Sequence, residues 1–132
     1  MSGGSSSFGE NVNQISALVV DDDRVIRTLH AAMLKALGVK VHLAVNGKEA
    51  VDLFRSGVNI HIVFMDLEMP VMNGIEATRE LRAMGVKSFI VGVSSRFLDE
   101  ERNEFMSAGL DQCYEKPLTM ANIKALLEEM KN

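Results

Sequence analysis

The sequence predicts a doubly wound α/β domain, and three observations indicate it. Short apolar runs alternate five times with segments whose apolar residues recur at helical spacing. The run 60–65 is apolar on both faces, which is typical of a strand buried within a parallel sheet. Most runs end in polar residues, at the strand ends where open α/β sheets bind ligands. The expected fold is therefore a flavodoxin-like (βα)5 sheet of five parallel strands in the order 2-1-3-4-5, with helices on both faces.

Composition limits the classes of protein that fit. The chain has 132 residues, a net charge of −4 and one cysteine, Cys113. The acidic balance argues against nucleic acid as a partner, and no apolar run approaches the roughly 20 residues that span a bilayer. Residues 1–14 are rich in Ser, Gly and Asn and predict a flexible tail, so one folded domain is expected over 15–132. We expect no membrane association and a cytoplasmic location, extending to the nucleus in a eukaryote.

The first strand and helix follow this tail. The apolar run 15–20 predicts the strand, which leads directly into Asp21, Asp22 and Asp23. Of these three acids Asp23 is best placed to cap the helix that follows. Gly38 is suited to end that helix. The apolar positions at helical spacing are Val25, Ile26, Leu29, Ala32, Met33 and Leu37.

The middle of the chain repeats this alternation. Residues 39–44 alternate apolar and polar side chains, which predicts a second strand. Asn46 is placed to cap the next helix, which Gly57 ends. The buried strand 60–65 then runs into a Pro-Asn-Gly loop and a third helix that stops at Gly85.

The last third adds two more strand and helix pairs. A charged helix is expected over 98–108, with Phe105 and Met106 facing inward. A final amphipathic helix begins at Thr119. The two strands expected here are 88–93 and 112–115.

Four predicted strands end in side chains suited to phosphate chemistry. Asp21 and Asp22, Asp66, Ser94 and Lys116 follow strands that are neighbours in the expected order, so they converge on one edge. Carboxylates packed together repel one another, and Mg2+ resolves that conflict because it prefers oxygen ligands. A lysine opposite them suits a phosphoryl oxygen. The pattern indicates phosphoryl transfer with Asp66 as the nucleophile.

Taken singly, each of these residues has a simpler interpretation. Asp66 before a Pro-Asn-Gly stretch fits a turn cap, Ser94 fits a turn, and most lysines such as Lys116 are solvated. Their coincidence at successive strand ends favours the functional interpretation.

The segments that carry these residues resemble the receiver domains of two-component response regulators, over about residues 15–131. The Met-Asp-x-x-Met-Pro-x-Met-Asn-Gly stretch is the most specific of them. It is similar to the plant single-domain (type-C) regulators and to the receivers of hybrid kinases. The matching segments are 18–22, 65–74, 93–95 and 115–118.

The resemblance implies a role for each acid. Asp66 would be phosphorylated by a phosphohistidine donor, either a histidine-containing phosphotransfer protein or a histidine kinase. Asp22, Asp66 and the main-chain carbonyl of Glu68 would bind Mg2+, with Asp21 supporting the metal through water.

The resemblance also implies which residues bind the phosphoryl group, and this chain departs from the family pattern at one position. Ser94 would bond the phosphoryl group, and Lys116 would pair with it, ahead of a peptide bond to Pro117 that is often cis in this family. Many bacterial members carry Tyr or Phe three residues before the lysine, where this chain has Cys113, with Tyr114 next. Cys113 therefore puts an aromatic switch in question and leaves open a movement of Ser94 and its loop toward the phosphoryl group.

Three histidines are expected to be structural. His30, His42 and His61 lie on separate predicted elements without metal-ligand spacing. The donor histidine must therefore come from another protein.

The leading hypothesis is a phosphoacceptor in a His-Asp phosphorelay that docks a partner or acts as a phosphate sink. We expect a monomeric single-domain regulator with self-catalysed phosphotransfer and weak autodephosphorylation, and the plant resemblance implies cytokinin signalling. An excised or stand-alone receiver of hybrid-kinase type is one alternative. A flavin-binding electron carrier is another, although the acids 21–23 would repel the flavin phosphate. A phosphatase with an aspartate nucleophile would need a second Asp where Glu68 stands.

Overall fold

The computed structural model describes residues 14–131. The tail predicted over residues 1–14 therefore lies almost entirely outside the described residues. Strands and helices alternate in the order β1 (Ser16–Val20), α2 (Arg24–Ala36), β2 (Lys40–Ala44), α3 (Gly47–Arg55), β3 (Ile62–Asp66), α4 (Gly74–Ala83), β4 (Phe89–Ser94), α5 (Asp99–Ala108), β5 (Gln112–Glu115) and α6 (Met120–Lys131). The alternation predicted from the apolar runs is confirmed, with strand bounds shifted by one or two residues.

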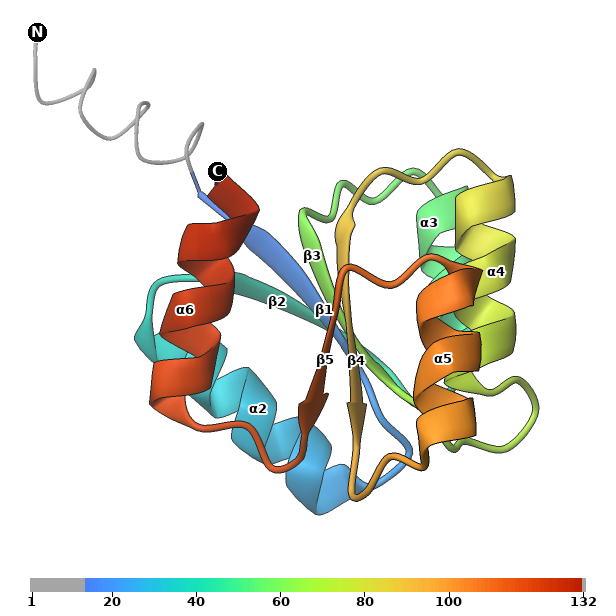
Figure 1. The fold of residues 1–132 in the computed structure, drawn as a ribbon. Helices are drawn as coiled ribbons and strands as arrows, with labels where there is room; N and C mark the ends of the chain where they lie inside the picture. Colours follow the sequence, from blue (N-terminus) through green and yellow to red (C-terminus); the bar gives the residue numbers. More distant parts are fainter. Residues whose placement is uncertain (1–13, 132) are drawn as a thin grey trace, which may run out of the picture.

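The strands form one parallel sheet in the order β2-β1-β3-β4-β5, as predicted. Helices α2 and α6 cover one face, and α3, α4 and α5 cover the other (Figure 1). Alternate side chains of β3 enter the two apolar clusters: Val63 and Met65 on one face, Ile62 and Phe64 on the other. All four side chains are fully buried, so β3 is the strand that both layers pack against.

Polar side chains begin the helices that follow the first three strands. The Asp23 carboxylate accepts hydrogen bonds from the first turn of α2. The side-chain oxygens of Asn46 and Asn73 do the same for α3 and α4. These caps satisfy backbone N–H groups that have no partner within the helix. The predicted caps Asp23 and Asn46 are confirmed, and each fixes a loop at the carboxyl edge of the sheet.

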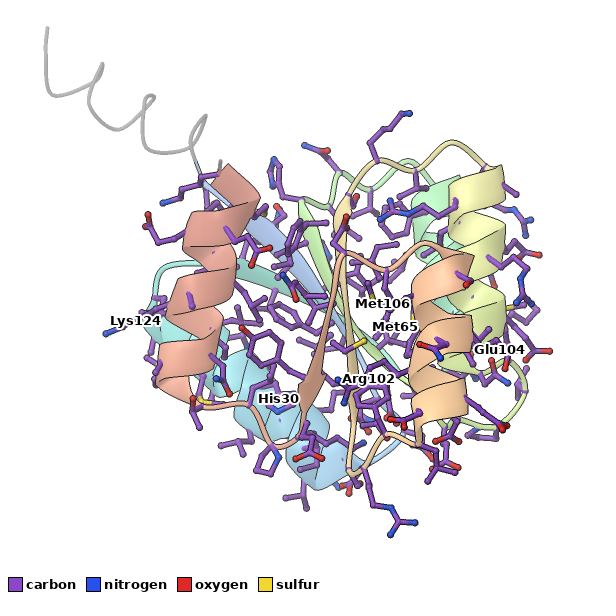
Figure 2. All side chains as sticks on the ribbon, viewed as in Figure 1. His30, Met65, Arg102, Glu104, Met106 and Lys124 are labelled. Atoms are coloured by element: carbon purple, nitrogen blue, oxygen red, sulfur yellow. The ribbon has the colours of Figure 1, made fainter. Side chains whose placement is uncertain are left out.

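Some apolar residues expected to face inward lie at the surface instead. Phe105 is fully buried, but Met106 is 41% exposed on α5 (Figure 2). A helix turns about 100° per residue, so the phase that packs Phe105 against Gly92 places Met106 over the edge strand β5, where its Sδ meets Cys113 and much of the side chain stays exposed. On α2, Val25 is 73% exposed and Leu29 is 41% exposed. The spacing of apolar residues identified the helices. When the apolar face of a helix is broad, however, that spacing does not show which of its residues contact the sheet.

No helix within residues 14–131 combines the length and the apolar content that are needed to cross a bilayer.

Candidate functional site

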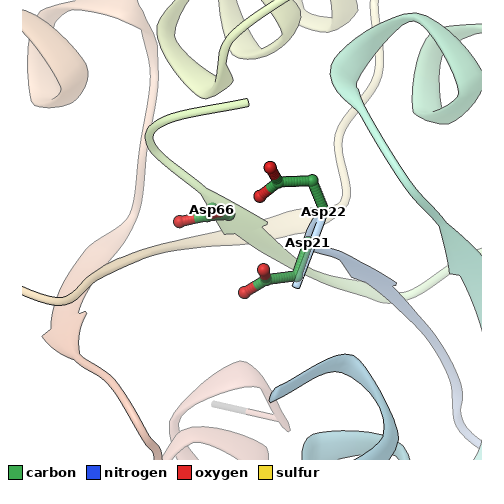
Figure 3. A group of neighbouring side chains, drawn as sticks. All are labelled: Asp21, Asp22 and Asp66. Atoms are coloured by element: carbon green, nitrogen blue, oxygen red, sulfur yellow. The ribbon is translucent and has the colours of Figure 1, made fainter. Parts of the chain in front are cut away.

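Three carboxylates meet at the carboxyl edge of the sheet. Asp21 and Asp22 follow β1, and Asp66 is the last residue of β3. These strands are adjacent and parallel, with Val20 paired to Met65, so the three acids lie side by side (Figure 3). One oxygen from each carboxylate lies within 4.8 Å of the other two. The structure thus brings together the acids that the sequence placed at this edge.

Burial changes the pKa of Asp66 within this cluster. Asp21 and Asp66 are buried, and Asp22 is exposed. Burial raises the pKa of Asp66 from its ordinary value of 3.8 to about 7; the Lys116 hydrogen bond opposes this rise, and the charge on Asp21 adds to it. Near neutral pH a proton therefore competes for the oxygen that a nucleophile would need.

Lys116 supplies the positive charge that contacts these acids. Its Nζ lies 2.9 Å from Asp21 Oδ2 and 3.0 Å from Asp66 Oδ1, and its side chain is 11% exposed. Burial alone would lower the pKa of Lys116, but the hydrogen bonds to Asp21 and Asp66 raise it above its usual value. Arg27 lies nearby but donates to the main-chain carbonyl of Asp21, not to a carboxylate. One lysine against three acids leaves the cluster with an excess of negative charge.

Ser94, at the end of the neighbouring strand β4, lines the same cleft as Asp66. The cleft encloses about 450 Å3, and its lining includes Asp22, Asp66, Ser94 and Lys116. Ser94 Oγ donates a 2.9 Å hydrogen bond to the carbonyl oxygen of Arg96. In this arrangement the hydroxyl holds the β4–α5 loop, and breaking that bond would free it to face the cleft.

The loop after β3 folds back over the strand end. Gly74 N–H donates to the Leu67 carbonyl at 2.9 Å, and a Cβ on Gly74 would overlap the Asp66 carbonyl oxygen. Only glycine permits this close approach. Glu68 lies in the same loop and lines the cleft, while its side chain is exposed.

The β5–α6 connection contains contacts that sequence reasoning missed. The peptide bond from Lys116 to Pro117 is cis, as the resemblance implied. Leu118 N–H donates to His30 Nε2 at 2.9 Å, a contact between residues 88 positions apart. No local pattern marks such a pair, because the periodicity of α2 shows only that His30 lies on a helix.

The other residues singled out from sequence take part in packing. His61 Nδ1 accepts a hydrogen bond from Ser16 N–H at the amino edge of the sheet, far along β3 from Asp66. Cys113 is partly buried with its Sγ 3.5 Å from Met106 Sδ, and burial raises the pKa of its thiol. Neither side chain belongs to the acidic cluster.

A hard divalent cation fits this cluster. Mg2+ takes carboxylate and carbonyl oxygens and keeps remaining positions for water or phosphate. Asp22, Asp66 and Glu68 line the cleft, and Asp21 lies buried beside them. Three carboxylates meet a single lysine here, so the described cluster lacks counter-charge, which such an ion would supply. The arrangement suits phosphoryl transfer to a carboxylate.

Comparisons with known proteins agree with this geometry. The sequence model of the family described as "Response regulator receiver domain" matches residues 17–128. The chain is 47% identical over 118 residues to "Two-component response regulator 24" of Arabidopsis thaliana, spanning 89% of this chain and 85% of that protein. It is 36% identical over 110 residues to "Sensor histidine kinase RcsC" of Escherichia coli (strain K12), spanning 83% of this chain and 12% of the kinase.

One solved structure is both similar in sequence and informative about metal. It is the receiver domain of sensor histidine kinase PA1611 from Pseudomonas aeruginosa PAO1, described with a magnesium ion coordinated in its active site cleft. It superposes with a TM-score of 0.80 at 30% identity, covering 90% of this chain and 99% of that one.

Proposed function

The chain belongs to the response regulator receiver domain family, and we propose that it accepts a phosphoryl group on Asp66 within a His-Asp phosphorelay. The observation that carries the proposal is the position of Asp66. Its carboxylate lies 3.0 Å from Lys116 Nζ, at the base of a cleft shared with Asp22. The excess of acid around it suits a cation and an incoming phosphate together.

The proposed step is a direct transfer from a phosphohistidine. An Asp66 oxygen forms a bond to phosphorus while the phosphorus–nitrogen bond of the donor breaks, and the electron pair stays on the histidine nitrogen, which takes up a proton from water. Lys116 stabilises the negative charge on the phosphoryl oxygens. Ser94 gives up its hydrogen bond to the Arg96 carbonyl and donates to a phosphoryl oxygen instead. Weak autodephosphorylation follows when water attacks phosphorus and releases inorganic phosphate with the Asp66 carboxylate.

Mg2+ is the proposed cofactor. Asp22, Asp66 and the main-chain carbonyl of Glu68 would hold it, and Asp21 would support it through water. When bound, the ion would supply positive charge beside the Asp66 carboxylate and the phosphoryl oxygens. The magnesium described in the PA1611 receiver domain supports this proposal.

The proposed donor is a histidine-containing phosphotransfer protein or a histidine kinase. The phosphorylated chain would signal by docking a partner or would drain phosphate from the donor. The match to part of a sensor kinase keeps the hybrid-kinase alternative in place. A monomeric state, a cytoplasmic or nuclear location and a link to cytokinin signalling remain predictions from sequence.

Phosphotransfer from a labelled donor tests the proposal. Wild-type protein, mixed with Mg2+ and a radiolabelled phosphohistidine phosphotransfer protein, should become labelled, and EDTA should prevent it. Asp66→Asn should stay unlabelled because an amide is not a nucleophile for this transfer. Asp52→Asn is the matched control, since Asp52 is an exposed acid on α3 that pairs with Lys48. Label that persists on Asp66→Asn, or forms equally in EDTA, would refute the assignment.

A further inference from the structure

The backbone around Lys116 is held at two points. Lys116 N–H donates to the Ser94 carbonyl at 2.8 Å, which ties the end of β5 to the end of β4. Leu118 N–H donates to His30 Nε2 at 2.9 Å, which ties the start of the next turn to α2. Pro117 stands between them and has no N–H of its own. The path of this turn, and with it the base of the Lys116 side chain, therefore depends on both bonds.

Histidine is an unusual residue type for the buried position that His30 occupies. It is 1% exposed in the middle of α2 (Figure 2), and its Nδ1 has no hydrogen-bond partner among the described residues. Because Nε2 accepts a hydrogen bond, the proton must be on Nδ1 and the ring must be neutral. Burial lowers the pKa of His30, which favours that neutral form. An unsatisfied buried N–H destabilises a fold, so an aliphatic side chain would serve simple packing better.

Helix α2 also connects His30 to the acids. The helix begins at Arg24, and its cap Asp23 directly follows the acid pair Asp21 and Asp22. Asp23 N–H in turn donates to Asp21 Oδ1 at 2.9 Å. A 13-residue helix is a rigid element whose start is fixed by the Asp23 cap, so His30 presents its ring to the Lys116 turn from a fixed position, and losing the ring's hydrogen bond leaves that cap in place.

We propose that His30 is a positioning residue for the phosphoacceptor site, holding the Lys116 turn by accepting the Leu118 N–H. This inference rests on the proposed function. Lys116 Nζ then stays between Asp21 and Asp66, where it meets a phosphoryl group on Asp66. The proposed Mg2+ ligands lie in the loop after β1, at the end of β3 and in the loop after β3, and none lies on the turn that His30 holds. Loss of the His30 bond should therefore affect the phosphoryl group more than the metal.

Two binding measurements on full-length variants separate these effects. The first is the Kd for Mg2+ alone, by calorimetry; the second is the Kd for beryllofluoride, a phosphoryl mimic, at saturating Mg2+. His30→Leu removes the acceptor and keeps the bulk, so it should weaken beryllofluoride by about tenfold and leave Mg2+ within about twofold. His30→Gln should stay near wild type, because its Oε1 reaches the place of Nε2.

Two further variants keep the test decisive. His30→Asn retains a polar amide that is too short to reach Leu118 and should behave like His30→Leu, including where the leucine variant does not fold. Ile123→Val trims a buried residue of α6 in the same layer, so it lowers stability without removing the bond and should bind both ligands as wild type does.

Different results would refute the role of His30 and the proposed function. His30→Leu or His30→Asn binding beryllofluoride as wild type does would overturn the inference. So would equal weakening of Mg2+ and beryllofluoride, or a His30→Gln protein as weak as His30→Leu. Wild-type protein that binds no beryllofluoride with Mg2+ would instead overturn the proposed function, and the inference with it.

Discussion

The two edges of the sheet each hold a charged cluster, and they differ in how the charge is balanced. At the carboxyl edge, Lys116 is the lysine that meets Asp21 and Asp66, with Asp22 beside them. At the amino edge, Arg82 pairs with the single acid Asp111 at 2.9 Å. The first cluster carries excess negative charge, and the second is neutral.

The charges of the amino-edge cluster are balanced by the protein's own groups. The Arg82 guanidinium also donates to the carbonyls of Val86, Ser88 and Gly109 at 2.8 to 2.9 Å. The Asp111 carboxylate also accepts the Ile90 N–H at 2.8 Å. This network joins α4 to the starts of β4 and β5 without calling for any other group.

The difference between the two clusters distinguishes an ion pair with a structural role from one at a functional site. Both edges use a cation and a carboxylate in direct contact, so the presence of an ion pair does not identify a site. What differs is the uncompensated acid: burial raises the pKa of Asp66 to about 7, and the carboxyl edge becomes complete only with a further positive charge. The following predictions test that contrast.

Removing the carboxyl-edge lysine should have the largest effect. Lys116→Met should slow phosphoryl uptake from a phosphohistidine donor by about 100-fold or more, because a buried cation that faces the transferring group is lost. Lys87→Met, at an exposed lysine near the amino edge, is the matched control and should react as wild type does. Initial rates of label transfer give the answer; equal rates for the two variants would contradict the role of Lys116.

Breaking the amino-edge pair should change stability instead. Arg82→Met leaves Asp111 and three carbonyls without their donor, so the free energy of unfolding should fall by about 2–4 kcal/mol. Urea denaturation measures the loss. Label transfer to the folded fraction should remain as in wild type. A folded Arg82→Met protein that no longer accepts phosphate would show that the two edges are coupled.

The carboxyl edge should also make the stability of the protein depend on pH. Asp66 holds a proton in the folded state up to about pH 7 but loses it near 3.8 when unfolded. Between these values the folded state binds more protons, so stability without Mg2+ should fall as pH rises from about 4 to about 7.

Replacing Asp66 by Asn should remove this dependence of stability on pH. Asp66→Asn should be more stable than wild type by about 1–3 kcal/mol near pH 8 in EDTA, since an amide has no charge to desolvate. Denaturation midpoints across this pH range would show it. Wild-type stability that rises from pH 4 to 7 would oppose the raised pKa of Asp66.

The smallest effect concerns strain in the loop after β3. Val71 has a φ of 72° and is 76% exposed, although a β-branched residue rarely adopts that conformation. Val71→Gly should raise the free energy of unfolding by about 0.5–1 kcal/mol, with phosphate uptake retained. Thermal unfolding compares the two proteins, and a less stable glycine variant would show that Val71 makes a contact worth more than its strain.

Sequence reasoning reached the carboxyl edge because its signal is local. Asp21, Asp66 and Ser94 each lie at the end of an apolar run, and Lys116 follows the short strand β5. The parallel order of the strands brings all four residues to one edge. The same rule does not reveal the Arg82 network, whose partners lie 4 to 29 positions away and are mostly backbone carbonyls.

The misassigned residues have a physical cause as well. Met106 and Phe105 are equally apolar, and only the packing of α5 on the sheet decides which of them is buried. His30 is buried, as a structural residue would be, but its contact with Leu118 could not be predicted, because it depends on how α2 and the β5–α6 turn meet in space. Such orientation and long-range contacts are set by tertiary packing.

Titration with Mg2+ tests the central claim most directly. If the carboxyl edge is short of positive charge, calorimetry of the wild-type protein near pH 8 should show one Mg2+ site, lost in Asp22→Asn and in Asp66→Asn. Asp111→Asn, at the balanced edge, should leave that site intact. Mg2+ binding that survives in Asp22→Asn and Asp66→Asn, or that is absent from the wild type, would contradict the account.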